Sequence, residues 1–176
     1  MIDGGTEGTP LPPSRVPPAL VRWGERLPLR LRRSTSCWWP FLLFPLLSLA
    51  LYGDTLGLYF QGDDWTLVGP RVGAAFLANP LSVFTQTHGV HYQPVTFLLH
   101  GVCSVLFGAT AWPYHLVNVL LFGVALALLW RYLARRGFPL LSRAAAVTVF
   151  GGAAIQYMVV QWIAAVSYIL LAVLLL

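Results

Sequence analysis

Long apolar runs separated by short polar segments form the dominant pattern of this sequence. The three longest lie at about residues 38–60, 114–133 and 144–176. A helix of roughly 20 apolar residues crosses the hydrocarbon core of a bilayer, so each of the first two runs fits one span. The third run is longer and carries Gln156 and Gln161 near its middle, which divides it into helices at about 144–158 and 162–176. The pattern predicts an all-α, polytopic membrane protein with about four transmembrane helices.

A further apolar stretch, residues 95–108 ("VTFLLHGVCSVLFG"), lies between the first two runs. At about 14 residues it is short for a transmembrane helix. We expect a helix that lies in the membrane interface or packs on the other helices. The loop 61–113 would then contain short interfacial helices.

The first 36 residues differ in composition from the rest, being rich in proline, glycine and arginine. Such a segment cannot bury a core, so residues 1–36 are predicted to form a disordered cytoplasmic tail, and residues 37–176 the membrane part. A cleaved signal peptide is the competing interpretation, but no convincing small-residue cleavage site follows the first apolar run. Cys37 and Cys103 are single thiols in or beside apolar helices, where packing is a better explanation than a disulfide or a metal site.

Composition and charge add an orientation to this picture. With 57% hydrophobic and only 10% charged residues, the chain cannot cover its apolar surface as a soluble domain would. Six of its eleven basic residues precede the first apolar run, and four lie at 131–143. The positive-inside rule therefore places both segments in the cytoplasm and the loop 61–113 outside the cytoplasmic (inner) membrane. This distribution explains the net charge of +5 without a nucleic-acid partner.

Two adjacent acids stand in that loop, in "YFQGDDWTLVGP" (residues 59–70). Asp63 and Asp64 are neighbours in sequence, so their side chains diverge and cannot share a proton. One of them could act as a general base or bind a divalent cation, Mg²⁺ or Mn²⁺, beside a phosphate. We slightly favour Asp64 as the catalytic group and metal ligand. In the alternative, Asp63 only caps a helix that begins at Trp65.

Other polar residues in the segments predicted to face outward indicate a function less specifically than the acidic pair does. His88 and His91 are three residues apart, the spacing of two metal ligands on a helix, but a glycine stands between them and no third ligand is nearby, so surface or interfacial histidines are the better explanation. His115 and Asn118 fall near the start of the second span, where polar groups usually bond across helices. No span carries the buried charge that a transporter or channel would need, because Asp54 lies near a helix end.

The order of these motifs resembles the N-terminal part of the GT-C glycosyltransferases that use polyprenyl-phosphate donors. It is most similar to the family related to protein O-mannosyltransferases and often linked to tetratricopeptide repeats. The resemblance covers about residues 45–140 and rests on four successive elements. These are an acidic pair after the first span, "HYQPVT", "FGATAWPYHLVN" and the arginine-rich "RYLARRG".

The resemblance implies transfer of a sugar from a polyprenyl-phosphate donor to an acceptor on the outer membrane face, as part of a longer enzyme. It assigns catalysis to Asp63 or Asp64. It assigns substrate binding to two groups, which are His91, Tyr92 and Gln93 in the second element and His115 and Asn118 in the third. Gln93 stands where the family commonly has arginine, which weakens phosphate binding there. A truncated or degenerate, non-catalytic membrane protein is the alternative; membrane lipid is a partner in both.

The predicted orientation can be tested with two reporter fusions. We expect fusions at Gly69 and at Gly137 to report opposite sides of the membrane, because the arginines follow the second span and the acids follow the first. The same sidedness at both positions would contradict the proposed topology.

Overall fold

The computed structural model describes residues 38–85, 87 and 91–176, and this part of the chain is helical. The predicted tail at 1–36, Cys37 and His88 lie outside the described residues. The helices in chain order are α2 (Pro40–Tyr52), η2 (Gly53–Gly57), α3 (Asp64–Leu67), α4 (Pro70–Ala78), η3 (Pro80–Phe84), α5 (Pro94–Phe107), α6 (Trp112–Arg135), α7 (Leu140–Gly152), α8 (Ala154–Gln161), η4 (Ile163–Ala165) and α9 (Val166–Leu175).

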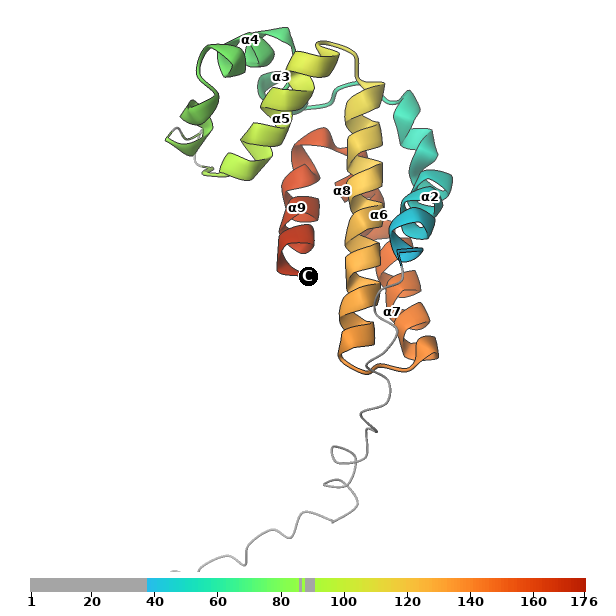
Figure 1. Ribbon diagram of the computed structural model, residues 1–176. Helices are drawn as coiled ribbons and strands as arrows, with labels where there is room; N and C mark the ends of the chain where they lie inside the picture. The colour runs from blue at the N-terminus through green and yellow to red at the C-terminus, as the bar shows by residue number, and fades with distance from the viewer. Residues whose placement is uncertain (1–37, 86, 88–90) are drawn as a thin grey trace, which may run out of the picture. The chain divides into compact units, whose positions relative to one another are not determined.

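Two segments have the length and hydropathy of a membrane span. They are Pro40–Gly57, formed by α2 and η2, and α6, Trp112–Arg135. They correspond to the first two predicted spans and lie side by side in antiparallel directions (Figure 1). Large apolar side chains such as Leu42, Leu46 and Leu51 point outward from α2, as expected for a helix surrounded by lipid.

The third predicted span is broken at a place that the sequence analysis did not predict. Helices α7 and α8 are bent by 57° at a break, so together they can be counted as one bent span. Ala153 adopts an extended conformation there and follows Gly151 and Gly152, which are poor helix formers. The prediction of one helix over 144–158 was therefore wrong, because it took only the later break into account.

The later break falls close to the predicted one. Trp162 is extended and separates α8 from η4 and α9. The apolar helix Ile163–Leu175 is shorter than the span predicted at 162–176. The described residues thus contain two helices that could cross a membrane, or three with the bent pair, where four were predicted.

Close approach of α2 and α6 determines how the long helices pack. A Cβ atom added to Gly123 in α6 would lie 2.3 Å from the Cα of Pro45 and 2.9 Å from the carbonyl carbon of Phe44. Only a glycine lets the two backbones come this close. The adjoining core contains Phe44, Tyr52 and Phe122, with the last two rings edge to face at 5.5 Å.

The short helices α3, α4 and α5 gather at the end of the bundle where α2 ends and α6 begins (Figure 1). Helix α5, Pro94–Phe107, agrees to within one residue at each end with the predicted helix at 95–108, which was judged too short to cross. It packs against α4 through two glycines. Gly73 faces the backbone of Ser104 at 2.9 Å from an added Cβ, and Gly101 faces the ring of Phe76 at 2.4 Å.

The Gly123 contact gives a stability prediction. Replacing Gly123 by alanine should lower the stability by about 3 kcal/mol, the upper part of the usual range for overpacking, because the added methyl group meets backbone atoms that cannot rotate away. Gly152→Ala is the matched control, since its added Cβ meets nothing within 4 Å. Thermal unfolding of the purified chain in detergent micelles measures both. Equal melting temperatures for the two variants would contradict the packing described for α2 and α6.

Candidate functional site

The acidic turn before α3 separates its two aspartates into different environments. Gly62 has φ +49°, and Asp63 follows it at the N-cap position of α3, with its side chain exposed and without a capping hydrogen bond. Asp64 is the first residue of the helix and is fully buried. The proposed capping role of the Asp63 side chain is therefore wrong, and α3 begins one residue before the predicted Trp65.

The carboxylate of Asp64 accepts two hydrogen bonds from backbone amides. Its Oδ2 accepts from the Gln61 N–H at 3.0 Å, which closes the turn. Its Oδ1 accepts from the Ala164 N–H at 2.8 Å, in the short η4 helix a hundred residues later. Burial raises the pKa of Asp64, and these amide bonds oppose that rise. The side chain thus fixes the acidic turn to the break between α8 and α9.

Asn118 satisfies the other side of the same break. Its Nδ2 donates to the carbonyl oxygen of Val160 at 3.4 Å and to that of Trp162 at 3.3 Å. These carbonyls lie where α8 ends and therefore lack the usual helical partners. Asn118 and Asp64 together supply a donor and an acceptor to one interrupted segment of backbone.

Two buried histidines lie near this segment without satisfied nitrogens. Neither ring nitrogen of His115 or His100 has a hydrogen-bond partner among the described residues. The carbonyl groups of Leu58, Tyr59 and Gln161 lie around the ring of His115, but none reaches hydrogen-bond geometry. Burial lowers the pKa of His100 to about 4, and the nearby carbonyl of Ile163 opposes this shift. At neutral pH His100 is an uncharged imidazole.

The predicted site residues fall into two groups. Asp64, His115 and Asn118 are buried around the break between α8 and α9. The second group is mostly on the surface: Asp63, His91 and Tyr92 are exposed and Gln93 is half-buried.

The element "HYQPVT" (residues 91–96) makes few side-chain hydrogen bonds in the described structure. The Tyr92 hydroxyl donates to the Phe84 carbonyl at 3.0 Å, and Gln93 occupies the N-cap position of α5 without a capping bond from its side chain. None of these contacts ties Tyr92 or Gln93 to the acidic turn. Substrate binding by His91, Tyr92 and Gln93 stays a prediction.

The sequence analysis missed a polar face on α5. Thr96, His100 and Ser104 are all buried and recur every four residues, the spacing that places side chains on one face of a helix. The Ser104 hydroxyl accepts a hydrogen bond from the Gly69 N–H at 3.1 Å, which holds the segment that follows α3. This spacing was the available signal, but it lay within a stretch dominated by apolar residues.

The arrangement does not form an evident cation site. No group of three His, Cys, Asp or Glu side chains that could hold a metal lies among the described residues. Asp64, the predicted ligand, already accepts a backbone amide bond on each oxygen. Asp63 keeps an exposed carboxylate, but one carboxylate alone is a poor site for Mg²⁺ or Mn²⁺. Binding of a divalent cation therefore stays a prediction.

Comparisons with models of protein families, with curated proteins and with solved structures find no match for this chain.

The neutral state of His100 predicts a dependence of stability on pH. The unfolded chain binds a proton near pH 6.5, whereas the folded chain does so only near pH 4. Stability is therefore fully present above pH 6.5 and decreases as the pH falls toward 4. Between pH 7 and pH 5 we expect a loss of about 2 kcal/mol from this residue.

Thermal unfolding in micelles across this pH range measures the effect. His100→Gln should unfold with a smaller loss between pH 7 and pH 5 than the parent chain. His91→Gln, which changes an exposed ring, should keep the parent slope. Asp64 is present in all three proteins, so its own titration cancels in the comparison. An unchanged slope in His100→Gln would show that this imidazole does not resist protonation.

Proposed function

We propose that this chain is the membrane part of a glycosyltransferase that resembles the GT-C enzymes and moves a sugar from a polyprenyl-phosphate donor to an acceptor at the outer membrane face. The observation that carries the proposal is the different exposure of the two aspartates in the acidic turn. Asp64 is buried and held by two backbone amides, and as a result Asp63 is presented to solvent at the end of the spanning helices.

This geometry favours Asp63 as the reacting carboxylate, in place of our earlier slight preference for Asp64. A general base must reach the proton that it removes, and an exposed carboxylate is accessible to an acceptor hydroxyl. Asp64 is fully buried, so an acceptor hydroxyl cannot reach its carboxylate unless the turn moves. Its role in the proposed reaction is to position the turn.

Aromatic residues flank the acidic turn in the sequence, and their rings contact one another. The rings of Tyr59 and Trp65 are 5.4 Å apart, and each side chain is 58% exposed. Phe60 contacts both rings and is buried beneath them. Exposed aromatic rings at the end of a membrane helix suit a ligand that has an apolar chain and a polar head. A lipid-linked sugar has this character.

The proposed reaction is a displacement at the anomeric carbon. The acceptor oxygen forms a bond to that carbon as the bond from the carbon to the phosphate oxygen breaks. The acceptor proton passes to the Asp63 carboxylate, and the lipid phosphate leaves with the electron pair. Gln93 offers an uncharged amide to a phosphate where arginine is common in the similar family, so recognition of the leaving group by this residue would be weak.

A non-catalytic role is the second candidate, because one observation favours it. Every strong contact of the acidic turn in the described structure is structural: both oxygens of Asp64 hold backbone amides, and the Thr66 hydroxyl donates to the Asp63 carbonyl at 2.8 Å. In that case Asp63 would be an ordinary surface acid whose replacement changes nothing.

Sugar transfer in membranes containing the full-length protein separates the two candidates. Asp63→Asn should reduce transfer from a lipid-linked donor by roughly 10² or more, because the amide keeps the shape but cannot accept the proton. Asp54→Asn is the matched control, since Asp54 is also an exposed acid, in η2 just after α2, where its Oδ2 accepts a hydrogen bond from the Tyr157 hydroxyl at 2.9 Å. It should transfer sugar at the parent rate.

Asp64→Asn should behave differently from Asp63→Asn. Its amide group would point an N–H at a backbone N–H, leaving buried donors unsatisfied at a cost of about 1–3 kcal/mol. We therefore expect lower thermal stability together with reduced transfer, whereas Asp63→Asn should unfold at the parent temperature. Parent-level transfer by Asp63→Asn at matched protein level would reject the catalytic assignment.

A further inference from the structure

Helix α5 buries its polar residues and exposes apolar ones. Its hydroxyl and imidazole side chains are all buried, and they are Thr96, His100 and Ser104. Every exposed residue of the helix is a valine or a leucine, namely Val95, Leu98, Val102, Val105 and Leu106. Their spacing places them on one side of the helix, which we call the valine–leucine face. A surface helix of a protein in water has the reverse arrangement.

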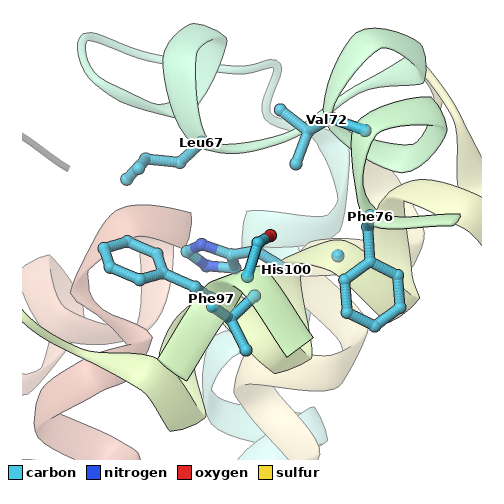
Figure 2. Close-up of a pocket in the computed structure, with 9 residues that line it drawn as sticks. Leu67, Val72, Phe76, Phe97 and His100 are labelled. Atoms are coloured by element: carbon cyan, nitrogen blue, oxygen red, sulfur yellow. The ribbon is translucent and has the colours of Figure 1, made fainter. Parts of the chain in front are cut away.

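The polar side of α5 is turned toward α4 and the segment before it. The Ser104 hydroxyl accepts a hydrogen bond from the Gly69 N–H at 3.1 Å. Figure 2 shows His100 beside a small cavity that is also lined by Val72 and Phe76 of α4. No residue of the valine–leucine face is among the described residues that line this cavity. The valine–leucine face therefore lies on the side of α5 that is turned away from α4.

Helix α4 has a different outer surface. Its exposed residues include the charged Arg71, one large apolar residue, Leu77, and the small residues Ala74, Ala75 and Ala78. Helices α4 and α5 pack against each other. The pair thus has one outer surface with a charge and mostly small side chains, and another that presents only valine and leucine.

The orientation of α5 indicates which surroundings suit the valine–leucine face. If these surroundings were water, a rotation of α5 by half a turn would bury the valines and leucines and hydrate the polar side chains. In hydrocarbon the same rotation would be unfavourable, because polar groups find no partners there. Helix α5 also contacts α9, whose exposed residues are Tyr168 and three leucines, and neither helix contains Asp, Glu, Lys or Arg. An apolar outer surface therefore extends over both helices.

We propose that the valine–leucine face of α5 contacts the acyl chains of the outer membrane leaflet. The 14 residues of α5 extend over about 21 Å, less than the hydrocarbon core of about 30 Å, so the helix enters this leaflet without crossing the membrane. An ordinary interfacial helix leaves its polar face open to water, whereas α4 and the protein interior cover the polar face of α5. This contact with lipid is independent of sugar transfer, since it involves neither aspartate of the acidic turn.

Spin labels on single cysteines test the proposal in the full chain, reconstituted in phosphatidylcholine vesicles. Cys37→Ser and Cys103→Ala remove the native thiols, and Val102→Cys places a nitroxide on the valine–leucine face. Molecular oxygen, which concentrates in hydrocarbon, should relax this label more than a water-soluble nickel chelate does. Leu46→Cys, on the exposed side of α2, should give the same order of effects. Ala74→Cys is the matched control on α4, and there the nickel chelate should have the larger effect.

Two results at Val102 would overturn the proposal. Stronger relaxation by the nickel chelate would show that water covers this face, and protection from both reagents would show that a second copy or another protein segment covers it. The unmodified chain gives a second measurement that does not depend on the folding of a variant. A lipid-soluble aryl diazirine, activated by light in the same vesicles, should label Leu98 and Val102 and spare Ser104, as located by mass spectrometry. Labelling of α2 without labelling of α5 would likewise reject the contact with lipid.

Discussion

Unpaired backbone groups at the breaks in the C-terminal helices are the constraint on which this structure depends. A helix that stops leaves carbonyl and amide groups without partners, and in the protein interior there is no bulk water to pair them. Here the neighbouring elements supply the partners. Asn118 donates to the carbonyls of Val160 and Trp162, and Asp64 accepts from the amide of Ala164. The polar residues of the bundle are thus placed where the backbone requires them.

At the earlier break, between α7 and α8, a side chain of another helix also pairs with a free backbone group. The Tyr52 hydroxyl, at the end of α2, donates to the carbonyl of Gly151 at 2.5 Å. Tyr52 can reach this carbonyl because Gly123 allows α2 to lie against α6, and Gly151 itself packs on Leu126 of α6. A change at the α2–α6 contact would therefore disturb a hydrogen bond at a third helix. Packing and backbone satisfaction are coupled in this bundle.

The sequence predicted local features well and long-range ones poorly. The apolar runs located α2, α5 and α6, because helix formation there depends on residues close in the chain. The break at Ala153 was missed because a glycine pair within an apolar run is also compatible with a continuous helix. The residues of the site were recognised as polar, but their partners could not be named. Asp64 and Ala164 are a hundred residues apart, and no local pattern links them.

The long-range bond between Asp64 and Ala164 also explains why the two adjacent aspartates have different roles. The bond from Gln61 closes the turn locally, and the bond from Ala164 attaches the turn to η4, which is held between α8 and α9 against α6. Asp63 then follows as the exposed neighbour, with its direction set by a bond that it does not make itself. Any chemistry at Asp63 therefore depends on the C-terminal helices, although none of their side chains needs to touch a substrate.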